Sequence, residues 1–514
     1  MAVIGLLSSP QLSAQQSEAD QAWSQGRYEA ARAAYQQVLA RDPRDVRANL
    51  RIGLLLSWRG KLDSALAFIR RARAADPIDP EIRLIHARVL AWDQQYDAAL
   101  RQYDSVLVQH PGMREAALGR ARTLAWAGRL EQARSTYQRL AATDSTDRDA
   151  LLGGAQVIAW AGDLAAAEDE YRRLLARNPR DLEARVGLGY VYLWQGRETA
   201  AGRQAGYVLA IDSTHKSARE LLRTTREVTR PSFESSAHWS NDSDQNTSFW
   251  QTLTGNTALG GGVGLFGSVN ALQTSDPALE ATRFGAEAGV SLKSGPLFAS
   301  GAGGARRLNP EIAPSRTAAT YRGRVSYRPV PRLGFGAGYA RQPFDEIAGL
   351  IERELDMESL EGNLDVRPTN RLTVYGGAGA VWLSDGNSRT SFSAGLNQRI
   401  GRRIFAGVFG RTLSFERRGV GYFSPDRFSV LEGVAGYHYE GRSWLAAVSG
   451  GIGAQQVGER GATQTEWHID GRVGTRWGIG NRLELFGLLT NSAVSSTTGA
   501  FRYRSAGLSL TLGL

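Results

Sequence analysis

Residues 466–477 read EWHIDGRVGTRW, and polar and apolar side chains alternate along them. One parity carries the apolar side chains of Trp467, Ile469, Val473 and Trp477. The other parity carries five ionisable side chains, those of Glu466, His468, Asp470, Arg472 and Arg476. Because successive side chains of a β-strand point to opposite faces, this segment is expected to form a strand with one apolar and one charged face.

The same alternation extends through the second half of the chain. It is clear in YRGRVSYR at residues 321–328, whose charged face would carry Arg322, Arg324 and Arg328. Short turns alternate with longer polar loops, such as residues 342–353 and 416–427. This alternation of short turns and long loops predicts sixteen antiparallel strands over residues 231–514. Each strand is long enough to cross a membrane at a tilt, for which about 9–11 residues are needed.

A soluble β-sandwich or β-propeller is the alternative fold for this half. Its strands would be nearer 5–6 residues, with the apolar face against a second sheet. Aromatic residues near strand ends, such as Trp444 and Trp477, instead favour the interfacial girdles of an outer-membrane barrel. Phe428 and Val430 are apolar but fall on the face opposite to the other apolar residues of their strand, such as Leu431. This predicts a β-bulge there or an exposed rim above the bilayer.

The first half repeats every 34 residues. Glycines hold this spacing at Gly26, Gly60, Gly128, Gly162 and Gly196, and Gln94 takes the place of the glycine in the third repeat. Alanine, tyrosine and proline positions keep the same phase, a pattern that resembles tetratricopeptide repeats (TPRs), in which each unit is a pair of antiparallel helices. We expect an all-α TPR solenoid over residues 18–228, with six repeats and a polar capping helix at 214–228.

A tryptophan ladder accompanies these repeats, at Trp58, Trp92, Trp126, Trp160 and Trp194. Each tryptophan lies about 140° around the helix from the small residue that packs on the partner helix. It therefore faces either the inner groove, where it would bind a sugar or peptide, or the space between successive helices, where it would be buried. The residues four positions earlier are the candidate contacts of a partner: Arg88, Arg122, Gln156 and Tyr190.

Composition narrows the chemistry. The chain has no cysteine and only six histidines, so we expect no thiolate site, no metal site and no cofactor. The net charge of +10 comes from scattered arginines rather than a basic helix, which does not favour nucleic acid. His438 and His468 are isolated candidates for a lipid-hydrolysing barrel, and without a nucleophile motif we expect no catalytic residues. Residues 1–14 resemble the remnant of a secretory signal peptide.

The combined layout resembles the YaiO-type outer-membrane protein family, in which TPRs precede a C-terminal barrel. It is more distantly similar to the outer-membrane subunit of bacterial cellulose export. The architecture and the tryptophan ladder favour export of an extracellular polysaccharide, and the alternative is a non-conducting scaffold that docks periplasmic proteins. With an even number of strands, the first and last residues of the barrel lie on the short-turn side. Short turns face the periplasm in such barrels, so the repeats are expected to be periplasmic. Expected partners are outer-membrane lipid, lipopolysaccharide and a periplasmic protein or glycan.

Overall fold

The computed structural model describes residues 10–330, 332–369, 371–401, 403–441, 443–493 and 502–514. The chain divides into two compact units, residues 1–160 and 161–514. The boundary falls inside the fifth repeat, between the helix that ends at Trp160 and the helix that begins at Leu164, rather than near Arg230, where the repeat region ends. Most of the predicted signal remnant, residues 1–9, lies outside the described residues, and helix α1 begins at Pro10.

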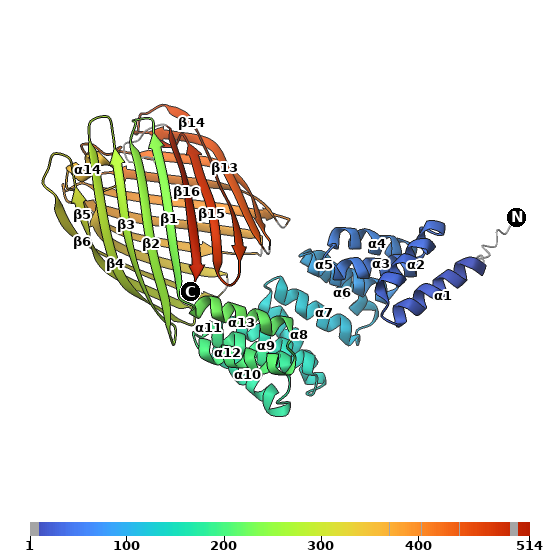
Figure 1. The fold of residues 1–514 in the computed structure, drawn as a ribbon. Coiled ribbons are helices and arrows are strands. Elements are labelled where there is room, and N and C mark those ends of the chain that lie inside the picture. Colours follow the sequence, from blue (N-terminus) through green and yellow to red (C-terminus); the bar gives the residue numbers. More distant parts are fainter. Residues whose placement is uncertain (1–9, 331, 370, 402, 442, 494–501) are drawn as a thin grey trace. The chain divides into compact units, whose positions relative to one another are not determined.

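Over its described residues, the first unit consists of four antiparallel helix pairs and the first helix of a fifth (Figure 1). Its helices are α1 (Pro10–Ser24), α2 (Tyr28–Arg41), α3 (Val46–Trp58), α4 (Leu62–Ala75), α5 (Pro80–Trp92), α6 (Tyr96–Gln109), α7 (Arg114–Trp126), α8 (Leu130–Thr143) and α9 (Arg148–Trp160). The second unit begins with α10 (Leu164–Arg177), α11 (Leu182–Trp194), α12 (Glu198–Ile211) and α13 (Lys216–Thr229). The predicted TPR solenoid and its capping helix are confirmed.

The geometry of the helix ends explains why a glycine recurs at the same place in most repeats. Gly60 follows α3 with a φ of 73°, a left-handed conformation that suits a residue without a Cβ. Gln94 occupies the equivalent position after α5 with a φ of 61°, so it holds the same turn without glycine's freedom. At the other end, the Asp45 side chain accepts a hydrogen bond from the amide of Ala48 and caps α3.

Tyrosines in the second helices fill the space left by glycines in the next repeat. A Cβ added to Gly153 would lie 2.4 Å from the ring of Tyr137, and one added to Gly187 would lie 2.3 Å from the ring of Tyr171. Both tyrosine side chains are buried. Burial raises the pKa of both hydroxyls, because it disfavours the phenolate. These glycine-tyrosine contacts are therefore part of the core between successive repeats.

His86 of α5 is buried in the first unit, and its Nδ1 lies 3.2 Å from Arg73 Nη1. Burial, together with the charges of Arg73 and Arg70, lowers its pKa from 6.5 to about 4. The unfolded chain therefore binds one proton more than the folded chain between these values. Folding stability should fall by about 3 kcal/mol as the pH drops from 6.5 to 4, and should lose nothing further from this group below pH 4.

This pH dependence can be measured on the full-length protein in detergent, by following helix unfolding at 222 nm between pH 4 and 7. Carboxylates titrate in the same range, so the informative quantity is the difference from His86→Gln, which cannot bind the proton. The wild type should lose more stability than the variant on acidification. Parallel pH profiles would show that His86 is not held neutral.

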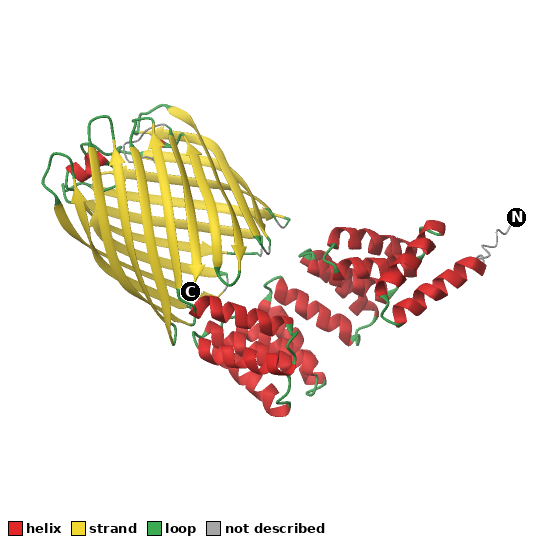
Figure 2. Ribbon diagram, viewed as in Figure 1, coloured by secondary structure: helices red, strands yellow, loops and turns green. Residues whose placement is uncertain are grey.

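The second unit continues into a closed antiparallel barrel of sixteen strands (Figure 2). The strands are β1 (Ser232–Asp242), β2 (Thr247–Gly260), β3 (Val263–Ser275), β4 (Glu280–Ser294), β5 (Leu297–Asn309), β6 (Arg316–Val330), β7 (Leu333–Pro343), β8 (Asp356–Val366), β9 (Leu372–Leu383), β10 (Ser388–Ile400), β11 (Ile404–Phe415), β12 (Phe428–Glu440), β13 (Trp444–Val457), β14 (Thr463–Trp477), β15 (Asn481–Thr490) and β16 (Tyr503–Gly513). The predicted strand number and fold class are confirmed.

Short turns and longer loops alternate as expected, and they define a short-turn end and a long-loop end of the barrel. Four of the predicted short turns, at residues 329–331, 367–370, 401–402 and 440–442, each include a residue outside the described ones. The first and last strands meet: the amide of Leu514 donates to the carbonyl of Pro231, with the atoms 2.8 Å apart. Arg230 donates to the carbonyl of Ile479 in the β14–β15 turn at 3.5 Å. The first and last residues of the barrel therefore both lie at its short-turn end.

Side-chain parity follows the prediction. Large apolar side chains such as Trp467, Ile469 and Val473 point outward and are more than 40% exposed. Glu466 and Asp470 of the same strand point into the lumen. An outward apolar surface with an inward polar surface is the arrangement that a bilayer requires, because lipid cannot solvate charged groups. In the described part of the chain, no helix combines the length and the hydropathy needed to cross a membrane.

The predicted bulge or rim at Phe428 and Val430 is wrong. Strand β12 pairs with both neighbours in unbroken register through these residues. Their side chains point inward and are buried in a hydrophobic cluster, where Phe428 packs with Leu350 and Tyr422. The parity break therefore marks a place where the lumen is filled with apolar side chains.

Candidate functional site

The long-loop end of the lumen is filled by connections that fold into it. The β7–β8 loop, residues 344–355, contains a short helix, α14 (Ala348–Glu352) (Figure 1). Leu350 belongs to the cluster formed with β11 and β12, whereas Ile351 packs with Leu272 of β3 and Leu308 of β5. Strands β3 and β11 stand eight places apart in a sixteen-stranded ring. One turn of helix therefore joins opposite walls of the barrel.

A buried carboxylate attaches this loop to the wall. Asp345 Oδ1 accepts from Arg283 Nη1 of β4 at 3.0 Å and from Arg306 Nη1 of β5 at 3.0 Å. The Asp345 side chain is 3% exposed and the Arg283 side chain 9% exposed. Gln342 accepts a further hydrogen bond from Arg306 at 3.0 Å. Because a buried charge needs a partner, the loop and the two arginines hold one another in place.

The β11–β12 loop, residues 416–427, completes the filling. The Tyr422 hydroxyl donates to Asp385 Oδ2 at 2.9 Å and accepts from Asn387 Nδ2 at 2.8 Å. Burial and the hydrogen bond to Asp385 raise its pKa to about 12, although the bond from Asn387 opposes the shift. Its ring packs edge-on against Phe344 of the β7–β8 loop, with centroids 5.7 Å apart. We call residues 344–355 and 416–427 together the plug.

Below the plug, the lumen is polar and open to water. The predicted lumen residue Arg322 pairs with Glu287 of β4 and remains 55% exposed. His438 and Glu440 of β12 are 59% and 57% exposed, although both point inward. Arg322 lies in the middle of β6, so solvent-accessible space reaches that part of the lumen wall, whereas His438 and Glu440 stand at the end of β12 beside the short turns.

The other predicted lumen residues also point inward, and their partners come from strands one or two places away in the ring. Arg328 pairs with Asp365 of β8 at 2.6 Å, and Arg476 pairs with Glu440 at 2.7 Å. Asp470 accepts a hydrogen bond from Ser449 of β13 at 2.7 Å. Arg324 and Arg472 share the inward parity of their strands. Glu466 and His468 lie beside a residue that the sequence analysis did not select, Glu432 of β12.

Aromatic rings share the lumen wall with these charges. His238 of β1 stacks on Trp250 of β2 with ring centroids 5.0 Å apart, and Phe486 of β15 lies 5.9 Å from His238. On another part of the wall, Tyr375 of β9 stacks on Phe409 of β11 at 6.5 Å. The lumen thus offers flat apolar faces between charged groups.

The predicted tryptophan ladder is partly buried. Trp58 is 51% exposed and stacks on Trp23, with centroids 5.6 Å apart. Trp92 and Trp126 pack against one core cluster of the first unit and Trp160 against another. These rings are half-buried, so they plug the space between helices and also keep part of their surface accessible.

The predicted neighbours of the ladder lie where their spacing placed them. The Arg88 guanidinium lies 5.7 Å from the ring centre of Trp92, and in the second unit Tyr190 lies 5.9 Å from Trp194. Arg122 and Gln156 are exposed on their helices. A role of these residues in binding stays a prediction.

Sequence reasoning missed Asp345, Arg283, Arg306 and Glu432. Alternation from Phe284 in β4 and from Leu431 in β12 would have turned Arg283 and Glu432 inward. No local signal showed that Asp345, in a polar loop, would enter the barrel. That outcome depends on the width of the lumen and on the apolar surface available inside it.

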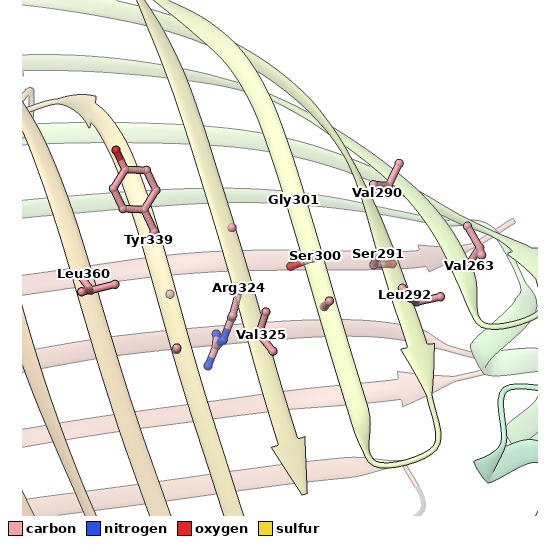
Figure 3. Close-up of a pocket in the computed structure, with 14 residues that line it drawn as sticks. Val263, Val290, Ser291, Leu292, Ser300, Gly301, Arg324, Val325, Tyr339 and Leu360 are labelled. Carbon is pink, nitrogen blue, oxygen red and sulfur yellow. The ribbon is translucent and has the colours of Figure 1, made fainter.

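The outer wall carries a hollow of about 480 Å³ between β3 and β8 (Figure 3). Small residues such as Ala299, Gly301 and Gly323 form its floor, and the larger side chains of Val290 and Tyr339 stand at its sides. Since these side chains share the outward parity, the hollow faces the lipid side of the barrel and is separate from the lumen.

Family models match the repeats. Residues 22–89 and 93–154 match a model described as a tetratricopeptide repeat, and residues 161–215 match a second model with the same description. No curated protein matches the chain. Membership of the YaiO-type family therefore stays a prediction.

Solved structures share the fold of parts of the chain. A tetratricopeptide repeat protein from Parabacteroides merdae is 17% identical, with a TM-score of 0.38 over 42% of this chain and 85% of that one. A bacterial polysaccharide outer membrane secretin is 10% identical, with a TM-score of 0.47 over 56% of this chain and 99% of that one. A thermophilic TPR protein in Thermus thermophilus is 24% identical, with a TM-score of 0.32 over 35% and 98%. These likenesses concern the fold alone. The matching repeat models and the closed barrel show that the protein is a TPR arm followed by an outer-membrane-type β-barrel.

Proposed function

We propose that this protein is a gated, non-enzymatic outer-membrane conduit for an extracellular polysaccharide, of the YaiO type. The observation that carries the proposal is a water-accessible lumen that loops fill at its long-loop end. If the barrel served only as an anchor, inward side chains of the strands themselves could fill it. Instead, His438 and Arg322 are more than half exposed inside the barrel, and the plug adds Ile347, Leu350 and Tyr422 to an apolar cluster at the long-loop end.

The lumen wall suits a carbohydrate. Aromatic faces are apolar and carry negative electrostatic potential, which complements the C–H bonds on the face of a sugar ring. Trp250 and Tyr375 supply such faces from opposite halves of the barrel, and Arg322 and Asp470 supply hydrogen-bonding groups between them. A polysaccharide could move from one face to the next without a single tight site.

We infer that the repeats lie in the periplasm, since short turns face the periplasm in outer-membrane barrels and both barrel ends lie at the short-turn end. The half-exposed indoles of the ladder would then meet a glycan or a periplasmic protein before the barrel does. A non-conducting scaffold is the second candidate, and the buried plug favours it.

A liposome experiment separates the two functions. The full-length protein is reconstituted into vesicles that hold fluorescent oligosaccharides, and residues 344–355 are replaced by a short Gly-Ser turn. The wild type should retain the sugar, and the variant should release it. A matched replacement of the β13–β14 loop, residues 458–462, should retain it. A variant that folds as a barrel but releases nothing would favour the scaffold.

A further inference from the structure

Three ionisable side chains converge on one patch of the lumen wall next to the plug. Glu432 comes from β12, and Glu466 and His468 come from β14. Their nearest oxygen and nitrogen atoms all lie within 4.8 Å of one another. His468 Nδ1 is 3.0 Å from Glu432 Oε2 and 3.9 Å from Glu466 Oε1. The sequence analysis expected no metal site, because the histidines are dispersed along the chain.

The strand register explains the convergence. Glu432, Gly453 and Glu466 stand in one row across β12, β13 and β14, and Gly451 stands opposite His468. A Cβ added to Gly451 would lie 2.4 Å from Glu432 Oε2 and 2.4 Å from His468 Cε1. The middle strand therefore has no side chain where the two outer strands bring theirs together, and Gly451 forms the floor of the cluster.

The polar atoms of the cluster are enclosed without being satisfied. The side chains of Glu432 and Glu466 are only 7% and 3% exposed. In the described part of the chain, Glu466 Oε2 is buried and has no hydrogen-bond partner. Glu432 Oε2 is buried in the same way and contacts His468 without a hydrogen bond to it. One histidine between two buried carboxylates leaves Glu466 Oε2 without a donor, which is costly unless a proton or a cation joins the two carboxylates.

We propose that Glu432, Glu466 and His468 bind a divalent transition-metal ion of the Zn²⁺ class. Carboxylate oxygen together with imidazole nitrogen is a donor set that suits Zn²⁺ and its first-row neighbours, whereas Ca²⁺ and Mg²⁺ prefer oxygen alone. Three protein ligands leave a coordination position for water. The ion would link β12 to β14 across β13 and neutralise the two carboxylates beside the plug.

The test uses the full-length protein, folded in detergent, stripped with EDTA and titrated with ZnCl₂ by calorimetry. We expect one Zn²⁺ per chain. Glu466→Gln keeps the shape of the side chain and removes its charge, so affinity should fall by roughly 100-fold or more, since loss of a supporting residue alone costs about 10–100-fold. Gly451→Ala keeps all three ligands and fills the floor, and it should weaken binding as well. Cobalt absorption bands would report the ligand geometry.

His438→Ala is the matched control, because His438 is an exposed lumen histidine of the same strand as Glu432 and lies outside the cluster. It should bind Zn²⁺ like the wild type. Heat-dependent migration in SDS gels verifies that each variant forms the barrel. Absence of stoichiometric binding, unchanged affinity in Glu466→Gln, or an equal loss in His438→Ala would each overturn the proposal. None of these results depends on polysaccharide passage.

Discussion

Replacing Asp345 with alanine is expected to open the long-loop end of the barrel. The change leaves Arg283 and Arg306 buried without their shared carboxylate, and removing one partner of a buried ion pair costs about 3–5 kcal/mol. That penalty falls on the docked form of the plug, because an undocked loop exposes both arginines to water. The equilibrium between docked and undocked loop should therefore shift by roughly 10²–10⁴-fold.

Planar-bilayer recording measures this opening directly. The wild type should be closed for most of the recording, whereas Asp345→Ala should show long openings of large conductance. Asp365→Ala is the matched control, since it breaks an ion pair with Arg328 that is partly exposed in the lumen and worth about 1 kcal/mol or less. It should alter ion preference without opening the barrel. If Asp345→Ala stays closed, the apolar contacts of Leu350 and Ile351 hold the plug by themselves.

The second large effect is expected in the first unit, where Tyr137→Ala should destabilise the repeats by about 3–5 kcal/mol, the range for a large buried aromatic side chain. The Tyr137 ring fills the space over Gly153, with Cε1 at 2.4 Å from the position of an added Cβ. Loss of the ring leaves a cavity between two repeats. Tyr137→Phe keeps the ring and should cost far less.

A double-mutant cycle tests the contact itself. Gly153→Ala alone should destabilise by about 1–3 kcal/mol, because the added methyl group meets the ring. In a Tyr137→Leu background the same methyl group has room, so its cost should largely disappear. The measurement is denaturant unfolding of the full-length protein, followed through its helix signal. Additive effects would show that ring and glycine do not meet.

The sequence predicted the regular parts of this molecule well. The 34-residue spacing located the helix pairs, and alternation around Trp467 gave the outward and inward faces of β14. Both are local properties, set by backbone periodicity and by the solvent on each face. The parity break at Phe428 was visible too, but its cause was not local.

The plug and the Glu432 cluster were not predictable, because each depends on strands distant in sequence. Leu350 is buried only because the lumen is wide enough to admit a helical turn and has apolar residues at that height. Glu432 meets Glu466 only because the glycines of β13 lie between them. Strand pairing brings together residues that no spacing along the chain relates.

The seam between β1 and β16 has a consequence for biosynthesis. Every other strand pairs with strands adjacent to it along the chain, whereas Ser232 pairs with Gly513. Hairpins can form one after another as the polypeptide is delivered, but the ring cannot close before its last strand arrives. Until then the nearly finished sheet keeps two unpaired edges, which are the sites most prone to aggregation. Chaperone protection is therefore needed most during that interval, and shortening β16 should harm assembly more than shortening any long loop.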